Sequence, residues 1–289
     1  MNTSNQATNT VLASRAIGAI LIDSGRLTPE NAERALRLSR EQNIRFGDAA
    51  LQLGVVKADD IEFALSRQFD YAYLPLGDKS VAEEVIAAFA PNSAAVESLR
   101  ALRTQLMLRW FAGEQERKAL AIVSPDHKEG RSWLAANLAV VFSQLGERTL
   151  LIDADMRSPV QHTLFRTDNR LGLSAVLSGR ANNEAIKRIT PLVGLSVLPA
   201  GAVPPNPQEL LARPAFGQLL QRLSDSYDVI IIDTPPACAY ADAQAVAVRT
   251  GGALMVARKN VSSSSMLLEA VGSITQTGAV VVGSVMNEA

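Results

Sequence analysis

Residues 119–132 read ALAIVSPDHKEGRS, an apolar run followed by a polar turn, and residues 133–145 continue with the apolar spacing of a helix that stops at Gly146. The apolar run predicts a buried strand, so residues 124–132 connect a strand to a helix. A loop in this position presents backbone N–H groups and the positive end of the helix dipole. We therefore expect residues 124–132 to bind phosphate groups.

This loop matches the common phosphate-loop pattern only in part. The pattern has Gly, four residues, Gly, Lys and then Ser or Thr. Here Pro125 replaces the first glycine and Arg131 replaces the lysine. Lys128 is another unusual residue, and its side chain either adds a phosphate contact or crowds the loop. The residues expected to contact the nucleotide are Lys128, Glu129, Gly130, Arg131, Ser132 and Trp133.

Five more apolar runs alternate with helical patterns along the rest of the chain. They cover residues 149–152, 195–198, 229–232, 253–256 and 279–282. Near-continuous Val, Ile and Leu runs indicate strands that are covered on both faces, and the intervening helices supply right-handed crossovers. The sequence therefore predicts an α/β domain over residues 96–289, with a parallel sheet flanked by helices. Ligands in such folds bind at the carboxyl ends of the strands.

Three carboxylates follow two of these predicted strands. Asp153 and Asp155 come after the run 149–152, and Asp233 comes after the run 229–232. We expect all three to converge near the phosphate loop, where Mg²⁺ and a triphosphate would offset their mutual repulsion. The alternative, that they only cap strands, is less favoured because all three coincide with the loop. ATP and Mg²⁺ are therefore the expected ligands.

The first part of the chain contains an internal repeat. Residues 17–39 align with residues 46–68, and Gly25 and Gly54 fall at equivalent positions. Each copy predicts two helices joined by a glycine in the left-handed conformation that follows many helices. We therefore expect a small all-helical domain over residues 14–75, after a disordered N-terminus (1–13) and before a linker (76–95).

Composition excludes several classes of function. The 28 Lys and Arg residues against 29 Asp and Glu give a net charge of −1, so no global basic field favours binding to nucleic acid. A single cysteine, Cys238, excludes an internal disulfide framework and a multi-cysteine metal site. The first ten residues lack a signal-peptide pattern, and the apolar runs are shorter than the ~20 residues of a membrane span. We expect a cytoplasmic chain.

These segments, together with residues 169–179 (NRLGLSAVLSG) and 198–207 (LPAGAVPPNP), resemble the cytoplasmic domain of bacterial tyrosine kinases. The resemblance covers about residues 93–288 and is strongest to the chain-length determinant kinases of the EpsG type. It implies a P-loop NTPase-like fold and transfer of the γ-phosphate of ATP to tyrosine. It also implies a role in exopolysaccharide synthesis beside a membrane co-polymerase (a Wzz-like chain-length protein), which would hold the chain at the inner membrane.

The resemblance also assigns roles to individual residues. It implies that Ser132, Asp155 and Asp233 hold Mg²⁺, with Asp155 binding directly or through water. Asp153 would orient or deprotonate the acceptor hydroxyl, and Arg131 would contact the β- and γ-phosphates. Arginine keeps the charge of the usual lysine but not its shape, so reduced turnover is expected.

A second motif of the same family predicts self-association. The spacing of Glu97, Arg100 and Arg103 is the one that mediates ring-like assembly in these kinases, and three-residue steps place the side chains on one stripe of a helix. We therefore expect a homo-oligomer whose stability depends on salt. The alternative is an ordinary ion pair within one helix.

The family pattern also leaves the function open. These kinases commonly end in a tyrosine cluster, whereas this sequence ends in VMNEA, so phosphorylation of a tail is not the expected main output. One interpretation is a weakened tyrosine kinase. Another is a catalytically silent module in which nucleotide binding controls assembly with a membrane partner. A partitioning-type ATPase is a third interpretation, although it usually carries a lysine where Asp126 stands.

The helical repeat has a resemblance of its own. Arg45-Phe46-Gly47 with Gly54 and Gln68 is similar to the motif in N-terminal domains of type II secretion and pilus ATPases (MshEN-like), some of which bind cyclic di-GMP. The resemblance implies Arg45, Gly47 and Gln68 as candidate contacts to that dinucleotide. The first copy carries Ala16 and Ser39 at the positions of Arg45 and Gln68. A packed docking module is therefore favoured over a dinucleotide site.

Overall fold

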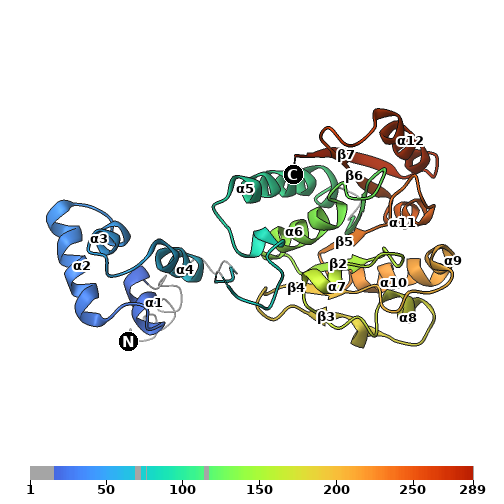
Figure 1. The fold of residues 1–289 in the computed structure, drawn as a ribbon. Helices are drawn as coiled ribbons and strands as arrows, with labels where there is room; N and C mark the ends of the chain where they lie inside the picture. The colour runs from blue at the N-terminus through green and yellow to red at the C-terminus, as the bar shows by residue number, and fades with distance from the viewer. Residues whose placement is uncertain (1–15, 69–72, 76, 114–116, 289) are drawn as a thin grey trace, which may run out of the picture. The chain divides into compact units, whose positions relative to one another are not determined.

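A computed structural model describes residues 16–68, 73–75, 77–113 and 117–288 (Figure 1). The chain divides into two compact units, Met1–Pro75 and Leu76–Ala289. The predicted disordered N-terminus, residues 1–13, lies outside the described residues. None of the helices within the described ranges has the length and hydropathy that a membrane span requires.

The described part of the first unit consists of four helices, two from each copy of the repeat. Its helices are α1 (Ile17–Asp23), α2 (Pro29–Gln42), α3 (Phe46–Gln52) and α4 (Ala58–Gln68). Gly25 and Gly54 follow α1 and α3 with φ values of +70° and +65°, the left-handed conformation that the repeat predicts. The hydroxyl of Thr28 accepts a hydrogen bond from the backbone N–H of Asn31 and so caps α2.

Helix packing accounts for two other glycines of the repeat. A Cβ on Gly47 would lie 3.4 Å from Cγ2 of Ile61, and a Cβ on Gly18 would lie 3.1 Å from the Phe46 ring. Both glycines therefore allow neighbouring helices to approach closely. Arg45 is exposed and Gln68 is half-buried. Since packing alone explains Gly47, binding of cyclic di-GMP stays a prediction.

The second unit is built on a seven-stranded sheet in the order β3-β4-β2-β5-β1-β6-β7. The pairs are parallel except for β3 with β4, so the predicted P-loop-like parallel sheet is confirmed. The antiparallel edge strand β3 was not predicted, because its two residues, Lys and Arg, carry no hydrophobic pattern. The strands are β1 (Ala119–Val123), β2 (Thr149–Asp153), β3 (Lys187–Arg188), β4 (Leu195–Leu198), β5 (Val229–Asp233), β6 (Gly252–Arg258) and β7 (Val280–Asn287).

Helices cover both faces of this sheet (Figure 1). Alternate residues of the central strands, including Ile152 and Ile232, join one core with Phe216 and Val246 from α10 and α11. Helix α6 packs on β1, β2 and β5 and is buried almost all round, because α5 and η1 cover its outer side. The helices are α5 (Ala94–Leu106), α6 (Arg131–Ser143), α7 (Gln161–Leu164), α8 (Leu173–Leu177), α9 (Pro207–Ala212), α10 (Pro214–Ser224), α11 (Asp242–Thr250) and α12 (Ser264–Thr275), with short turns η1 (Ile86–Ala88), η2 (Met107–Phe111) and η3 (Asn183–Ala185).

The segment predicted as a linker, residues 76–95, belongs largely to the second unit. Val81 and Val85 are fully buried. The side chain of Asn137 on α6 accepts from the N–H of Ala87 at 2.9 Å, and Gln144 donates to the carbonyl of Ala87 at 2.9 Å. The linker prediction is therefore wrong for this part. The hydrophobic periodicity of this segment is weak in the sequence, whereas in the structure its short apolar side chains pack beside α6.

An ion pair joins the starts of β2 and β5 and gives a pH-dependent prediction. Asp228 accepts from the Arg148 guanidinium at 2.6 and 2.9 Å, and this hydrogen bonding lowers the pKa of Asp228 to about 2. The pair stabilises the fold above the ordinary pKa of 3.8, and this stabilisation is lost as the pH falls through about 2.

Because the two side chains are 56% and 32% exposed, water weakens the pair. We expect Asp228→Asn to lower the free energy of unfolding at pH 7 by at most about 1 kcal/mol. Urea unfolding at pH 7 and near pH 2 tests this, and a difference that stays constant with pH would contradict it.

Candidate nucleotide-binding site

The candidate site lies at the carboxyl ends of the central strands. Asp153 ends β2 and is directly paired in register with Asp233, which ends β5. The loop after β1 leads into α6, whose first residue is Arg131. Parallel pairing therefore brings residues that are 80 positions apart in the sequence to one edge of the sheet, beside the amino end of a helix.

Arg131 lies inside the site rather than at its rim. Its side chain is 8% exposed. The guanidinium donates from Nε to Asp233 at 3.1 Å, from Nη2 to Asp155 at 3.1 Å and from Nη1 to the hydroxyl of Ser124 at 2.9 Å. A planar fork with several donors suits this three-way contact, whereas a lysine ammonium would not span it. Arg131 is thus the counter-ion of the buried carboxylates.

A glutamine that the sequence did not single out completes this network. The amide nitrogen of Gln161, at the start of α7, donates to Asp233 at 2.8 Å and to the carbonyl of Ser132 at 3.0 Å. Burial raises the pKa of Asp233, while the Arg131 charge and the Gln161 hydrogen bond oppose this. No motif identifies Gln161, because a single glutamine in a loop carries no pattern. Gln161 contacts Asp233 and Ser132 because the chain folds back toward the site after β2.

Asp153 is fully buried, and its oxygens face the backbone. One oxygen accepts from the N–H of Asp155 at 3.2 Å, and the other accepts from the N–H groups of Val160 and Gln161 at 3.1 and 3.0 Å. Burial, together with the nearby charge of Asp233, raises the pKa of Asp153 well above its ordinary value. These contacts make Asp153 the organiser of the turn after β2. Its role toward an acceptor hydroxyl stays a prediction.

The phosphate loop is held from behind by the ends of β6 and β7. The Asn287 side chain donates to the carbonyl of Glu129 at 3.1 Å, and Arg258 donates to the carbonyl of Lys128 at 3.2 Å. The carboxylate of Glu129, which is 2% exposed, accepts from the N–H of Asp126 at 2.8 Å and from the hydroxyl of Ser262. The Glu129 carboxylate therefore holds the loop together, and contact of this residue with a nucleotide stays a prediction.

Two loop residues have left-handed backbone conformations. Lys128 has φ +60° and is exposed, so its side chain does not fill the loop. Gly130 has φ +91°, and a Cβ there would lie 2.1 Å from Nδ2 of Asn287. The left-handed conformation therefore favours glycine at this position, and the Asn287 side chain would have to shift to admit a Cβ.

We expect Gly130→Ala to disrupt the loop. The left-handed conformation alone costs about 1–2 kcal/mol for alanine, and the clash with Asn287 adds to this cost. Nucleotide affinity should fall by more than about tenfold, measured by calorimetry. Gly146→Ala is the matched control, because Gly146 has φ +98° with no atom within 4 Å of the added Cβ. Asn287→Ala should partly rescue Gly130→Ala, and the absence of any rescue would contradict the clash.

Two cavities adjoin the loop. One of 160 Å³ is lined by residues 128–133, including the half-buried Ser132 and Trp133. The other, of 650 Å³, is lined by Gly130 and Trp133 together with mainly aliphatic residues of α5, α6 and β7. The first is small enough to suit phosphate groups, and the second falls in the usual size range of ligand pockets.

The predicted self-association motif on α5 is divided between the surface and the interior. Arg100 contacts Glu97 at 3.1 Å on the surface. Arg103 is instead buried and donates to the carbonyl of Val141 on α6 at 2.7 Å. Helix α5 is thus anchored to α6 through Arg103, and Glu97 and Arg100 are the members of the motif that face solvent.

Another arginine beside the site was not predicted. Arg157 forms a bidentate pair with the buried Asp242 at 3.2 and 3.0 Å, and its guanidinium lies 4.0 Å from the centre of the Tyr240 ring. The pair ties the turn after β2 to the start of α11. The sequence motif drew attention to the aspartates of this turn and not to its arginine.

The residues present fit a magnesium site of the P-loop kind. Magnesium is usually held by one or two carboxylates together with phosphate oxygens and water, not by a full protein cage. Asp155, Asp233 and the Ser132 hydroxyl supply suitable oxygen ligands. Within the described ranges no group of three or more His, Cys, Asp or Glu side chains is arranged to hold a metal by itself. A metal here would therefore depend on a nucleotide for part of its coordination.

The fold and the site define a class of protein before any relative is considered. A parallel sheet with a phosphate loop after β1 and acidic residues at neighbouring strand ends is the architecture of P-loop nucleotide-binding proteins. A family model described as an AAA domain matches residues 122–256, which include the loop, β2 and β5.

Similarity to known proteins defines the family more narrowly. Tyrosine-protein kinase YwqD of Bacillus subtilis is 36% identical over 203 residues, covering 70% of this chain and 85% of that relative. The solved kinase domain of the Escherichia coli tyrosine kinase ETK has a TM-score of 0.67 and 34% identity, covering 75% of this chain and 80% of that chain. The chain belongs to the bacterial tyrosine-protein kinase family. It is also 37% identical over 204 residues to tyrosine-protein kinase wzc of Salmonella typhimurium, but the match spans only 28% of that relative.

Proposed function

We propose that this protein is an ATP-dependent protein tyrosine kinase homologue that regulates exopolysaccharide synthesis and chain length. The observation that carries the proposal is the cluster of Asp155 and Asp233 around a buried arginine, directly beside a phosphate loop. Burying these charges has a desolvation cost that pairing with Arg131 often does not fully repay, which favours a functional role for the cluster. Family membership supports tyrosine as the class of acceptor.

In this proposal some residues bind the nucleotide and others neutralise the charge of its phosphates. The amino end of α6 and the loop N–H groups bind the phosphates, and the aliphatic cavity beside Trp133 receives the base. Ser132, Asp155 and Asp233 would hold Mg²⁺, which supplies positive charge against the transferred phosphoryl group. Arg131 would move from the carboxylates to the β- and γ-phosphates. A cation about 4 Å from a phosphate contributes about 4 kcal/mol at an effective dielectric constant of 20.

A silent, nucleotide-gated binding module is the second candidate. Two observations favour it: Asp153 uses both oxygens to hold backbone N–H groups, and Arg131 is already paired with the carboxylates. In this case ATP would release Arg131 and change the assembly of the protein without phosphorylating tyrosine.

The two functions differ in the fate of the γ-phosphate. We expect the protein, incubated with Mg²⁺, γ-labelled ATP and a Tyr-Glu copolymer, to transfer label to tyrosine more slowly than the relative YwqD, because Arg131 stands where the common phosphate-loop pattern has lysine. Loss of the signal in Asp233→Asn would assign it to this site. Absence of transfer, with ATP still bound, would select the binding module instead.

The proposed setting is the cytoplasmic face of the inner membrane. A membrane polysaccharide co-polymerase would hold the protein there, and Glu97 and Arg100 would contribute to a homo-oligomer. Because Glu97 is mostly exposed, such contacts would weaken with salt. Sedimentation at low and high salt tests this assembly.

A further inference from the structure

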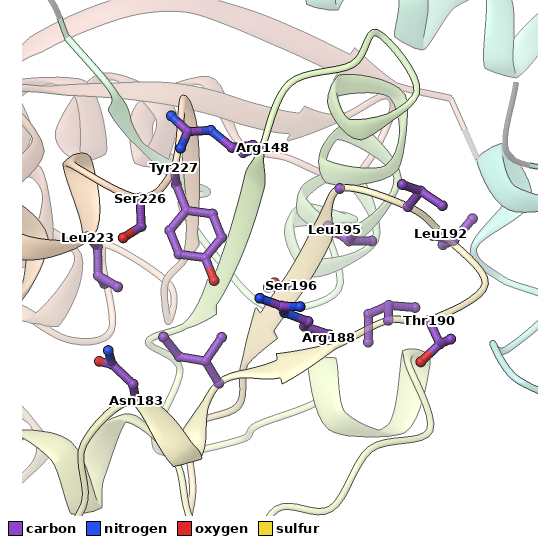
Figure 2. Close-up of a pocket in the computed structure, with 14 residues that line it drawn as sticks. Arg148, Asn183, Arg188, Thr190, Leu192, Leu195, Ser196, Leu223, Ser226 and Tyr227 are labelled. Carbon is purple, nitrogen blue, oxygen red and sulfur yellow. The ribbon is translucent and has the colours of Figure 1, made fainter. Parts of the chain in front are cut away.

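A second polar cavity, of 720 Å³, lies at the other end of the sheet (Figure 2). Its lining comes from the starts of β2, β4 and β5 and from the hairpin between β3 and β4. Strand β2 has five residues, which span about 16 Å at 3.3 Å per residue. The cavity is therefore separate from the cluster around Asp153 and Asp233.

Several polar side chains of this cavity have no hydrogen bond or ion pair within the described part of the chain. Figure 2 shows the Tyr227 hydroxyl directed toward Ser196 and Arg188. Ser196 is only 6% exposed and lines the cavity. Asn183, Arg188, Thr190 and Ser226 are exposed, so water hydrates them in the free protein, and a ligand would exchange these waters for direct contacts. The polar residues that line the cavity without such partners are Asn183, Arg188, Thr190, Ser196, Ser226 and Tyr227.

The lining of the cavity carries one positive charge without an acidic partner in the described part of the chain, that of the exposed Arg188. The 14 lining residues include two arginines and no carboxylate. Arg148 is neutralised by Asp228, whereas Arg188 has no acidic partner among the described residues. The neighbouring Glu184 does not line the cavity, and its carboxylate accepts from the N–H of Asn182 at 3.0 Å. Arg188 is thus a free guanidinium beside several hydroxyl donors, which is a suitable arrangement for an anion.

The opposite part of the wall is apolar. Ile189, Leu195 and Leu223 are buried and line the cavity together with the Tyr227 ring. A volume of 720 Å³ lies in the range of small-molecule pockets, which combine such walls with a few placed polar groups. An inorganic ion would contact only the polar residues of the cavity and would leave its apolar lining uncovered.

We propose that this cavity binds a small organic anion, with a phosphate or carboxylate group attached to an apolar ring or short chain. The guanidinium of Arg188 and the hydroxyls of Tyr227 and Ser196 hold the anionic group. The leucine side chains bury the apolar body. This site is independent of the proposed nucleotide site and of kinase activity.

Phenyl phosphate is a suitable probe, because it joins a phosphate group to an apolar ring. We expect saturable binding by the full chain in calorimetry, unaffected by excess Mg²⁺ and ATP. Arg188→Gln should weaken binding at least about tenfold, and Tyr227→Phe about threefold. Arg180→Gln is the matched control, because Arg180 is exposed, contacts Ser178 and does not line the cavity. Phenol and inorganic phosphate should each bind at least about tenfold more weakly than phenyl phosphate.

Three results would overturn the proposal. The first is the absence of saturable binding up to about 10 mM phenyl phosphate, because a dissociation constant above this concentration is too weak for a specific binding site. The second is equal affinity in the wild type, Arg188→Gln and Tyr227→Phe. The third is displacement of phenyl phosphate by ATP, which would assign the binding to the phosphate loop. Retained binding in Asp233→Asn would separate this site from the nucleotide site even if the kinase proposal fails.

Discussion

Asp233→Asn is expected to abolish the magnesium-dependent part of ATP binding. The carboxylate of Asp233 is fully buried and contacts both Arg131 and Gln161, so it lies at the centre of the site. Two unit charges about 4 Å apart interact by about 4 kcal/mol at an effective dielectric constant of 20, and Mg²⁺ carries two charges, so removing one carboxylate beside it costs at least about 4 kcal/mol. ATP affinity in the presence of Mg²⁺ should fall by about 100-fold or more, measured by calorimetry.

The fold should tolerate this substitution. Burial raises the pKa of Asp233, which means that its charge is unfavourable in the folded protein. Asparagine keeps an oxygen that can accept from Arg131 or Gln161. We expect the melting temperature without ligand to change by only a few degrees, and ATP binding in EDTA to be no weaker in Asp233→Asn than in the wild type, because the substitution loosens Arg131 and removes a negative charge near the phosphates.

Asp228→Asn is the matched control for this experiment. It makes the same chemical change just before the other end of β5, about 16 Å from Asp233 by strand length. It should leave ATP affinity unchanged. Equal magnesium-dependent affinity in Asp233→Asn and the wild type would remove the proposed metal site.

The central part of the fold could be predicted because burial leaves a clear pattern. The runs at β1, β2 and β5 are fully or almost fully apolar, since helices cover both of their faces. The edge strand β3 has two polar residues and no such pattern. The prediction of a linker around Val81 and Val85 was wrong. Short apolar residues are equally typical of a packed loop and of a linker, so the sequence could not distinguish the two.

The candidate site was predictable in its location and less so in its contacts. Strand ends and a loop pattern pointed to Asp153, Asp155 and Asp233 as neighbours. The contacts of these side chains depend on segments that fold back to the site, and no local sequence pattern predicts those segments. Gln161 is an example. The same is true of Glu129, whose carboxylate contacts Ser262, and of Arg103, which is buried against α6.

Arg131→Gln is expected to destabilise the protein strongly in the absence of metal. The substitution removes the guanidinium that contacts Asp155 and Asp233 and leaves these buried carboxylates, with Asp153 beside them, without a counter-ion. Breaking a buried ion pair from one side costs about 3–5 kcal/mol. For a unit of this size that corresponds to a fall of roughly 10 °C in melting temperature.

Magnesium should restore much of this loss, because the freed carboxylates bind a divalent cation that stabilises the folded state by mass action. The melting temperature of Arg131→Gln should therefore rise steeply with Mg²⁺, and that of the wild type only slightly. Arg148→Gln, which removes an exposed arginine from its pair with Asp228, should show neither the large loss nor the recovery. If Mg²⁺ shifted the wild type and Arg131→Gln equally, Arg131 would not compete with the metal for Asp155 and Asp233. The release of Arg131 by ATP, on which both proposed functions depend, would then lose its physical basis.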